Sequence, residues 1–346
     1  MRVVVIGATG NVGTSVVQAL GDDERVDSIL GVARRRPRTS FAKMEFASAD
    51  VTRDDLVQLL SGADAVVHLA WLIQPSRDQD VLWRTNVYGS HRVFEAAGRA
   101  GVGALVYASS IGVYSPGPKQ RVDESWPREG VRTSWYARHK VEVERRLDRF
   151  ELQHPDVRVV RLRPALIMKR GAAEEVRRLF FGPFLPGALV QPGTLPLVPH
   201  VPGAVVQVVH SHDVGDAYRR AVVQPDARGA YNIAAEPELD GRRLATALGA
   251  RTITVPARLA RALAGATWLA RLHPTSPDWL DLALGVPLLD TRRAREELGW
   301  APRHDAEEVV RELLAGVADG ASVATPPLRP DSRGEEIAAG IGKDQV

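Results

Sequence analysis

The chain has 346 residues, of which 45% are hydrophobic and 25% are charged, as is usual for a globular protein with a substantial core. It contains no cysteine, which excludes disulfides, thiolate metal sites and thiol nucleophiles. The 45 basic and 42 acidic residues nearly balance, and only Arg34, Arg35 and Arg36 form a basic run, so the charge pattern argues against a nucleic-acid partner or a membrane partner.

The start of the chain, MRVVVIGATG, has no apolar run before a small-residue cleavage site. No later stretch approaches the roughly 18 uninterrupted apolar residues of a membrane-spanning helix. We therefore expect a cytoplasmic protein.

In chain order, the first half alternates short β-branched runs with amphipathic stretches, a pattern typical of βαβ units. We expect buried strands at 3–6, 28–33, 65–69, 104–109 and 157–162. Helices are expected between them at 12–20, 53–60, 85–100 and 134–153. This alternation predicts an α/β fold with a doubly wound parallel sheet.

A glycine-rich segment, GATGNVG, joins the first expected strand to the first expected helix. Glycines at these positions allow a tight turn, the approach of a pyrophosphate to the backbone, and close packing of helix on strand. The N-terminus of the helix then presents unpaired N–H groups and a positive dipole end to the phosphates. The segment predicts a Rossmann-type dinucleotide site whose contacts are Gly7, Thr9, Gly10, Asn11, Val12 and Gly13.

The end of the second strand indicates which dinucleotide is bound. An acidic residue there would bind the ribose 2′-hydroxyl of NAD, but Arg34 and Arg35 follow Ala33 instead. Guanidinium groups bind phosphates bidentately, so we expect NADP(H) in preference to NAD(H). The alternative is a solvated basic loop. Asp50, with Val51 beside it, is expected near the adenine, although its carboxylate could instead stabilise a helix N-terminus.

Tyr136 and Lys140 are four residues apart in SWYARHK and therefore lie on one face of a helix. A free tyrosine has a pKa of about 10 and is a poor base at neutral pH. A nearby ammonium group favours the phenolate, which brings the hydroxyl toward proton transfer. We therefore interpret Tyr136 as the catalytic acid or base and Lys140 as the group that tunes it.

Ser110 follows the strand VYAS at the carboxyl edge of the expected sheet, where open α/β folds bind their ligands. Its hydroxyl could donate to a substrate oxygen as charge develops there. Ser109 is the rival candidate, and an ordinary loop serine is the other interpretation.

The second half has a different texture, because glycine and proline become frequent from about Met168. We expect a Rossmann domain at 1–167 and a smaller, discontinuous substrate lobe at 168–204 and 239–287. Segments 205–238 and 288–320 are expected to return to the main domain or pack on it. Residues 325–346, rich in proline, glycine and charge, are expected to be a disordered tail.

These motifs together resemble the extended short-chain dehydrogenase/reductases, also called the NAD(P)-dependent epimerase/dehydratase family. The resemblance extends to about residue 315 and rests on eight segments in the family's order: GATGNVG, DAVVHLA, NVYGS, VYASSIGVY, YARHK, RLRP, VVHSHDVGDAY and DTRRAREELGWAPR. It implies that Ser110, Tyr136 and Lys140 are catalytic and that Lys140 also binds the nicotinamide ribose. It further implies cofactor contacts at Leu69, Ala70, Asn86 and Pro164.

Two departures from the family pattern concern the substrate. The segment RLRPALIMKRG lacks the asparagine that usually helps nucleotide-sugar enzymes hold a diphosphate, and no Asp-Glu pair follows Ser110. The residues expected around the reaction centre are mostly apolar, which suits an apolar or aromatic small-molecule substrate. They are Trp71, Ile73, Ile111, Ala165 and Ile167. Packing between the two lobes is the alternative role for them.

Three functions stay open on the sequence alone. The leading hypothesis is reversible hydride transfer between NADP(H) and a carbonyl or hydroxyl carbon. The second is epimerisation of a nucleotide sugar through transient oxidation, and the third is a redox-sensing module without chemistry.

The resemblance also implies a homodimer formed by the helices at 85–100 and 134–153. The histidines of VVHSHDVG are expected to cap a helix rather than bind a metal.

Overall fold

The computed structural model describes residues 1–74, 77–182, 194 and 196–328. Its centre is a seven-stranded parallel sheet in the order β11-β7-β5-β4-β1-β2-β3. The strands are β1 Arg2–Ile6, β2 Ser28–Ala33, β3 Met44–Ser48, β4 Ala65–His68, β5 Ala104–Ala108, β7 Arg158–Pro164 and β11 Gly229–Ile233. The predicted doubly wound parallel sheet is confirmed.

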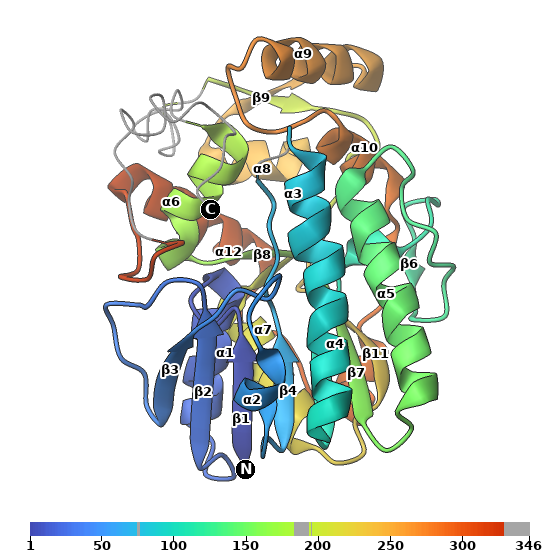
Figure 1. The fold of residues 1–346 in the computed structure, drawn as a ribbon. Coiled ribbons are helices and arrows are strands. Elements are labelled where there is room, and N and C mark those ends of the chain that lie inside the picture. Colours follow the sequence, from blue (N-terminus) through green and yellow to red (C-terminus); the bar gives the residue numbers. More distant parts are fainter. Residues whose placement is uncertain (75–76, 183–193, 195, 329–346) are drawn as a thin grey trace.

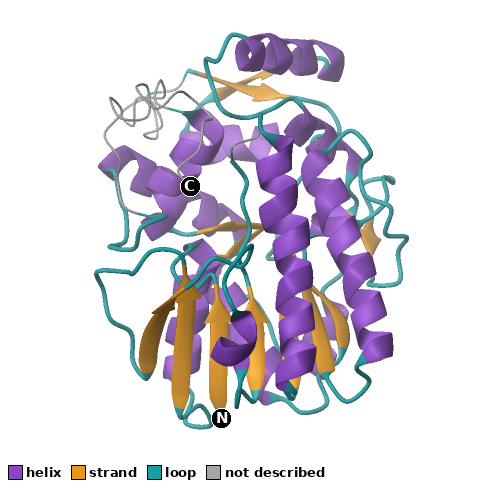
Figure 2. Cartoon of the chain, in the orientation of Figure 1, coloured by secondary structure: helices purple, strands orange, loops and turns teal. Residues whose placement is uncertain are grey.

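Helices cover both faces of this sheet (Figure 2). The burial of the β1 side chains explains this arrangement. Val3 and Val5 point into one apolar cluster with α1 and α7, whereas Val4 and Ile6 point into the other with α2, α4 and α5. A strand that is buried on both faces reads as a continuous apolar run, as this one does. The helices of these two layers are α1 Asn11–Gly21, α7 Ser211–Val223, α2 Leu56–Leu60, α4 Gly89–Ala100 and α5 Trp135–Gln153.

Two predicted helices have different starting points, and caps explain both. The helix expected at 85–100 is the last part of a longer one, in which α3 Gln79–Trp83, a π-helical stretch at Arg84–Tyr88 and α4 follow without a break. Asp78 caps its first turn by accepting from the Val81 amide at 3.1 Å. The helix expected at 53–60 begins at Leu56, because Asp55 is its N-cap.

Most of the second half of the chain, together with β6, forms smaller elements above the carboxyl ends of the strands (Figure 1), whereas α7, β11 and α11 lie with the main sheet. Three short parallel pairs connect them, namely β8 with β10, β9 with β12 and β6 with β13. These strands are β6 Arg121–Val122, β8 Leu166–Met168, β9 Leu197–His200, β10 Val208–His210, β12 Arg251–Thr254 and β13 Leu288–Leu289. The helices are α6 Ala173–Val176, α8 Gly241–Leu248, α9 Ala257–Leu269, α10 Asp278–Gly285, α11 Arg292–Glu297 and α12 Ala306–Asp319. Shorter helical turns are 3-10 helices at Ile111–Val113 and Arg170–Ala172 and a π-helical turn at Arg177–Phe181.

The segment 205–238 contributes β11 to the edge of the main sheet and α7 to the layer beside α1. In the segment 288–320, α11 contacts β11, but α12 packs on α6, α8 and β10. The apolar face of α12 explains this difference, because Val309 and Val310 join one cluster with Val208, and Leu313 and Val317 another with Ala173. Helix α12 therefore serves mainly the small lobe.

The first residues of the expected disordered tail, 325–328, are ordered and packed, contrary to the prediction. Thr325 and Leu328 are 1% and 0% exposed, so the first four residues pack on the body of the protein. Residues 329–346, the rest of the expected tail, lie outside the described residues, as do 183–193 and 195 of the expected substrate lobe. None of the helices in the described ranges is long and apolar enough to cross a membrane.

Candidate active site

The glycine-rich loop between β1 and α1 has the geometry that a dinucleotide requires. Gly7 has φ of +90°, and a Cβ there would lie 2.8 Å from the amide nitrogen of Ala70. A Cβ on Gly13 would lie 2.1 Å from the carbonyl oxygen of Gly7, so only glycine lets α1 pack so closely on the turn. Gly10 is the N-cap of α1 and supplies no side-chain cap to its first amides. The loop therefore fits a pyrophosphate at the helix N-terminus.

Lys169 stabilises the start of α1 at this loop through hydrogen bonds. No motif in the sequence indicated this role. Its buried Nζ donates to the carbonyl oxygen of Asn11 at 2.7 Å and to the hydroxyls of Thr14 and Ser15 at 2.7 and 3.0 Å. The Asn11 amide nitrogen in turn donates to the carbonyl oxygen of Ile167 at 3.1 Å. Strand β8 is thereby tied to the predicted cofactor loop. Neighbouring Thr9 is 5% exposed and Val12 is partly buried.

The basic run follows β2, as predicted, and it faces the end of β3. The Ser48 hydroxyl donates to the carbonyl oxygen of Arg34 at 2.8 Å and fixes the first arginine of the run. Burial raises the pKa of Asp50, but hydrogen bonds from Thr52 and the charge of Arg34 outweigh it and leave that pKa below its usual value. One Asp50 oxygen already accepts from the amide and the hydroxyl of Thr52. Its proposed contact with adenine stays a prediction.

Two cofactor residues predicted from the fourth strand lie where that strand ends. Leu69 donates its amide to the carbonyl oxygen of Ile6 at 2.8 Å, which extends the β1–β4 pairing, and Ala70 faces Gly7. Asn86 is 0% exposed, and its side chain both accepts from the Leu72 amide at 2.7 Å and donates to the Leu72 carbonyl at 2.8 Å. The Asn86 side chain thus supports the segment after β4, and its direct contact with the cofactor stays a prediction.

The structure brings the three predicted catalytic residues together at the carboxyl edge of the sheet. Ser110 follows β5, and Tyr136 and Lys140 lie one turn apart on α5, which Ser134 caps by accepting from the Ala137 amide at 3.3 Å. A hydrogen bond links Ser110 and Tyr136, and Lys140 Nζ donates to the carbonyl oxygen of Ala108 at 2.7 Å. Strand β5 and helix α5 thus fix the set in place.

Ser109 is not a second candidate for the same role. Its hydroxyl donates to Glu144 at 2.5 Å, two turns beyond Tyr136 on α5. Ser110 Oγ instead accepts from the Gly112 amide at 3.0 Å and bonds to the phenol. The geometry favours Ser110, as the sequence did.

Burial controls the protonation of this set. It raises the pKa of Tyr136 to about 12, and the hydrogen bond with Ser110 only partly opposes that rise. It also lowers the pKa of Lys140 well below its usual range, and the carboxylate of Glu144 opposes this fall. Tyr136 therefore carries its proton at neutral pH in the free protein, which suits donation to a substrate oxygen.

An aromatic cluster surrounds Tyr136. The ring centroid of Trp71 lies 5.8 Å from that of Tyr136 in an edge-on arrangement, and the ring centroid of Trp279 lies 5.1 Å from it. The Trp71 ring also lies 3.5 Å from Lys140 Nζ, and Phe180 packs edge-on against Trp279 at 5.1 Å. Trp279 and Phe180 come from the small lobe, and no sequence motif indicated either of them.

The other predicted substrate residues lie in different surroundings. Ile111 packs with Tyr136 and Trp279 in one apolar cluster, and Ala165 is 6% exposed in another cluster near Tyr114. Ile167 lies on β8 beside the cofactor loop, and Ile73 is partly buried after β4. Pro164, expected at the cofactor, is buried at the end of β7.

The comparison with protein families decides the relationship that the motifs suggested. Residues 3–234 match the family model described as the NAD dependent epimerase/dehydratase family. The chain belongs to this family. The resemblance inferred from the motifs is confirmed, and so is the class of NAD(P)-dependent enzymes to which it assigned the chain.

Relatives in this family differ in length. An uncharacterized protein of Mycobacterium tuberculosis is 28% identical over 319 residues, which are 92% of this chain but 30% of that protein. The chain thus spans less than a third of the length of that curated relative. The UDP-glucose 4-epimerase of Mycolicibacterium smegmatis is 28% identical over 328 residues, which are 88% of this chain and 94% of that enzyme.

Solved structures show the same fold. MoeE5 in complex with UDP-glucose and NAD aligns with a TM-score of 0.69 at 22% identity, over 93% of this chain and 100% of that one. The Thermus thermophilus UDP-glucose 4-epimerase in complex with NAD aligns with a TM-score of 0.67 at 20% identity, over 92% and 99% of the chains. At these identities the likeness concerns the fold.

The histidines at 210 and 212 take part in the N-terminal cap of α7. His210 is the N-cap of α7, and its Nδ1 accepts from the His212 amide at 3.2 Å. Asp213 accepts from the amide of His304 at 3.1 Å and from its ring nitrogen at 3.0 Å. Over the described ranges, no group of three or more such side chains could hold a metal ion.

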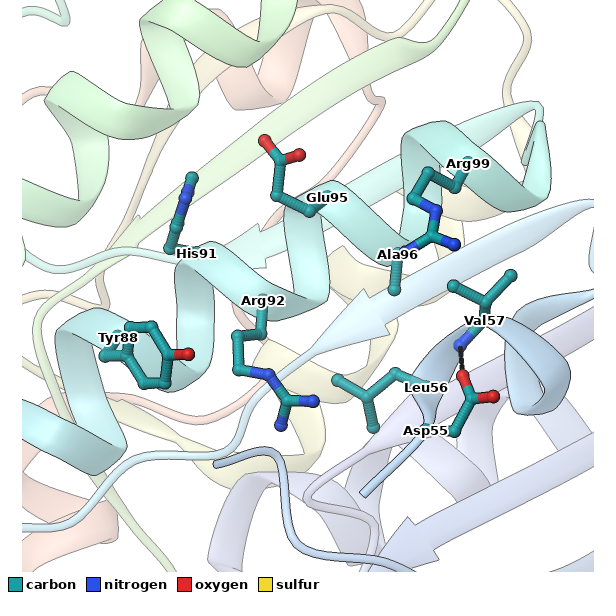
Figure 3. A pocket seen from close by; sticks show the side chains of 9 residues that line it. All are labelled: Asp55, Leu56, Val57, Tyr88, His91, Arg92, Glu95, Ala96 and Arg99. Atoms are coloured by element: carbon teal, nitrogen blue, oxygen red, sulfur yellow. Dashed lines mark hydrogen bonds between the residues drawn. The ribbon is translucent and has the colours of Figure 1, made fainter. Parts of the chain in front are cut away.

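A hollow of about 280 Å³ lies between α2 and α4, away from the catalytic set. Figure 3 shows its lining, in which Asp55 is engaged as the cap of α2. Arg92 donates to the carbonyl oxygens of Val51 and Asp54 at 2.8 and 2.9 Å. The lining residues are Asp55, Leu56, Val57, Tyr88, His91, Arg92, Glu95, Ala96 and Arg99. None of the predicted site residues lines this hollow.

Proposed function

We propose that this chain catalyses hydride transfer between a nicotinamide dinucleotide and the carbonyl or carbinol carbon of a small molecule. The single observation that carries the proposal is the junction of Ser110, Tyr136 and Lys140 beside a loop that fits a dinucleotide. The bound nicotinamide supplies or accepts the hydride. Tyr136 supplies the proton to the substrate oxygen, or removes it in the reverse direction.

The other two residues support this proton transfer. Ser110 donates a hydrogen bond to the substrate oxygen, which stabilises the charge that develops there. Lys140 favours the phenolate form that Tyr136 reaches after giving up its proton. Because the pKa of Tyr136 is about 12 before substrate binds, the free protein is prepared for reduction of a carbonyl group.

We further propose that the cofactor is NADP(H). Arg34 and Arg35 follow β2, where an acidic residue would favour NAD, and no acidic residue stands at 33–38. A guanidinium group binds the 2′-phosphate of NADP through charge-assisted hydrogen bonds. NAD(H) is the alternative, because the aligned structures of MoeE5 and of the Thermus thermophilus epimerase are NAD complexes.

The proposed substrate is apolar or aromatic. Trp71 and Trp279 stand against the Tyr136 ring, and Phe180 extends this aromatic cluster into the small lobe. Aromatic rings bind flat apolar molecules through large contact areas and preferred stacking geometries. The segment after β7, PALIMKRG, also lacks the asparagine expected for a sugar diphosphate.

A nucleotide-sugar epimerase is the second candidate, and a specific observation favours it. The UDP-glucose 4-epimerase of Mycolicibacterium smegmatis aligns over 94% of its own length. The same catalytic set would serve that reaction, because transient oxidation at a carbinol carbon also begins with proton removal by a tyrosine. The two candidates differ in whether the cofactor changes its oxidation state over a complete cycle.

One experiment separates them. Purified protein is mixed with NADPH or NADH and a panel of aromatic and aliphatic ketones and aldehydes, and absorbance at the nicotinamide band is followed. Separately, UDP-glucose is incubated without added reductant and assayed for UDP-galactose. Steady NADPH oxidation supports the proposal. Interconversion of the sugars with no net cofactor change supports the epimerase, and absence of both reactions overturns hydride transfer as the function.

We also propose that the protein is a homodimer. Helices α4 and α5 lie side by side on one face of the molecule (Figure 1), and Trp83 and Tyr88, on the helical stretch that precedes α4, are 43% and 47% exposed. Large exposed aromatic residues are enriched in protein interfaces. Light scattering at twice 37.7 kDa supports the dimer, and a stable species at 37.7 kDa contradicts it.

A further inference from the structure

Helix α5 carries a third charged residue in line with the catalytic pair. Tyr136, Lys140 and Glu144 are spaced by four, so their side chains lie along one face of the helix. Glu144 is 1% exposed and lies one turn beyond Lys140. A carboxylate so deeply buried loses its hydration and must be stabilised by partners in the protein.

Those partners hold Glu144 as a carboxylate. Arg163 donates to both of its oxygens, Nε to Oε1 at 2.9 Å and Nη2 to Oε2 at 2.7 Å. Arg128 donates to Oε2 at 2.7 Å, and the Ser109 hydroxyl donates to Oε1 at 2.5 Å. Burial acts to raise the pKa of Glu144, but the charge and hydrogen bonds of Arg163, the charge of Arg161 and the hydrogen bond from Ser109 lower it from its usual 4.5 to about 2.

Arg163 is itself fixed, so the carboxylate has one position. Its Nη1 donates to the Tyr114 hydroxyl at 3.1 Å and to the carbonyl oxygen of Glu124 at 3.0 Å. The Tyr114 hydroxyl donates to Asn232 on β11 at 2.6 Å. The network therefore connects β11, β7 and β5 to the catalytic helix.

We infer that Glu144 is a positioning residue of the hydride-transfer site: its fixed carboxylate maintains the positive charge of Lys140 and, through Ser109, the place of the strand end that carries Ser110. This inference rests on the proposed function, since it assigns Glu144 a part in the same proton transfer. Glu144 acts through other residues and is not itself a catalytic residue.

The surroundings of Lys140 explain why a carboxylate is needed there. Lys140 is 3% exposed, and burial alone disfavours its ammonium form. Its nearest partners are the Ala108 carbonyl oxygen at 2.7 Å and the Trp71 ring at 3.5 Å, and neither carries a full negative charge. Glu144 is the group whose charge opposes the effect of burial on Lys140.

The influence of Glu144 reaches Tyr136 through Lys140. A protonated Lys140 stabilises the phenolate of Tyr136, whereas a neutral amine does not. Lys140 Nζ lies 5.8 Å from the centroid of the Tyr136 ring, while burial and the hydrogen bond with Ser110 set the pKa of Tyr136 in the free protein. The titratable and charged groups around Lys140 and Glu144 are His68 on β4, Tyr107 on β5, Arg161 and Arg163 on β7, Tyr114 and Arg128 in the loops before α5, and Tyr136 and Asp148 on α5.

The charge of Lys140 can be measured without turnover, because the chain contains only five lysines, Lys43, Lys119, Lys140, Lys169 and Lys343. The full chain is labelled with ¹³Cε-lysine, the Lys140 signal is assigned by its loss in Lys140→Met, and its chemical shift is followed against pH. In Glu144→Gln we expect the midpoint to fall by about one to two pH units, the size of one charge interaction at a few ångströms. Glu142→Gln is the matched control, because Glu142 lies on the same helix and its carboxylate forms an ion pair with Arg146.

The kinetic readout uses the oxidative direction, in which Tyr136 must lose its proton. The acidic limb of the kcat profile in Glu144→Gln should move to higher pH, and kcat at neutral pH should fall about tenfold or more with KM nearly unchanged. A uniform loss of active protein without a moved limb indicates a merely structural residue and contradicts the inference. An unmoved Lys140 midpoint contradicts it too, whereas a moved midpoint in a protein without any turnover contradicts the proposed function alone.

Arg128→Gln tests the same idea in the opposite direction, and it decides the matter where Glu144→Gln does not fold. The Arg128 side chain is 35% exposed, so its loss is tolerated more easily than a change at Arg163. Removing this cation leaves more of the Glu144 charge acting on Lys140. The Lys140 midpoint should rise and the acidic limb should move to lower pH. A midpoint that stays in place or falls overturns the inference.

Discussion

Strand β5 and helix α9 lie at two extremes of burial. Leu105 and Val106 of β5 are 0% exposed, whereas Leu259 and Leu263 of α9 are 50% and 55% exposed, and α9 has no buried residue in the part of the chain that the structure describes. Strand β5 leads to the catalytic Ser110, whereas helix α9 belongs to the small lobe above the sheet (Figure 1). The comparison teaches that the chemistry is held by a rigid, doubly covered sheet.

The two regions meet at the aromatic cluster around Tyr136. Tyr136 and Trp71 are supplied by the sheet domain, whereas Trp279 and Phe180 are supplied by the lobe. A substitution on the sheet side should therefore affect proton transfer or folding, and one on the lobe side should affect substrate preference.

Tyr136→Phe should abolish most of the activity. The variant removes the hydroxyl that exchanges a proton with the substrate, so kcat should fall by about 10²- to 10⁴-fold, while NADPH affinity changes little. Steady-state kinetics and a fluorescence titration with NADPH measure the two quantities. Tyr88→Phe, an exposed tyrosine outside the set, is the control. Retained activity in Tyr136→Phe would remove this residue from the mechanism.

Glu144→Gln should destabilise the fold, because it leaves Arg163 buried without its carboxylate. The free energy of unfolding should fall by about 3–5 kcal/mol at neutral pH. Since folding lowers the pKa of Glu144 from 4.5 to about 2, its contribution is complete above 4.5 and is lost as pH falls toward 2. Urea unfolding between pH 7 and pH 3 measures both effects.

The control for that measurement is Glu142→Gln, which removes a partly exposed ion pair with Arg146 on the same helix. The wild-type and control proteins should lose stability with acid more steeply than Glu144→Gln. Equal slopes for all three proteins would show that the buried carboxylate is not what acid titrates.

Arg34→Ala should weaken NADPH binding without affecting NADH. A charge-assisted hydrogen bond to the 2′-phosphate contributes about 1.5–3 kcal/mol, so the Kd for NADPH should rise at least tenfold. The Kd for NADH, which lacks that phosphate, is the internal control. Equal changes in Kd for both dinucleotides would contradict a contact between Arg34 and the 2′-phosphate and would favour the alternative of a solvated basic loop.

Trp279→Ala changes the lobe side of the cluster. We expect kcat/KM for aromatic carbonyl substrates to fall roughly tenfold, with a smaller change for short aliphatic ones. The Lys140 titration should be unaffected, because Trp279 belongs to α10 and Lys140 Nζ contacts Trp71. An equal fall of kcat/KM for all substrates would show that Trp279 supports catalysis in general and does not determine substrate preference.

Leu263→Ala on α9 should have the smallest effect. An exposed leucine contributes little to folding, so the free energy of unfolding should change by less than about 0.5 kcal/mol and kcat/KM should stay the same. Thermal unfolding monitored by circular dichroism checks this. A loss as large as that of a core leucine would mean that α9 is covered in solution, and the contrast with β5 would disappear.

The sequence by itself determined the sheet, the loop and the catalytic pair, because each is encoded locally. Apolar runs such as Val3 to Ile6, glycines at a turn, and a Tyr and a Lys four residues apart have fixed geometric consequences in a strand, a loop and a helix. Starts of helices were less certain, since Asp55 and Asp78 act as caps through side-chain hydrogen bonds. The hydrogen bond between Asn86 and Leu72 depends on the fold and could not be predicted from the sequence.

The tertiary structure alone decided the contacts between distant segments. Trp279 reaches Tyr136 from 143 residues away, Lys169 reaches the loop at Asn11, and Arg163 on β7 meets Glu144 on α5. Such pairs depend on strand order and on the return of the chain to the main sheet, which no local spacing encodes. The physical reason is that local motifs fix backbone conformation, whereas burial and ion pairing depend on which elements pack together.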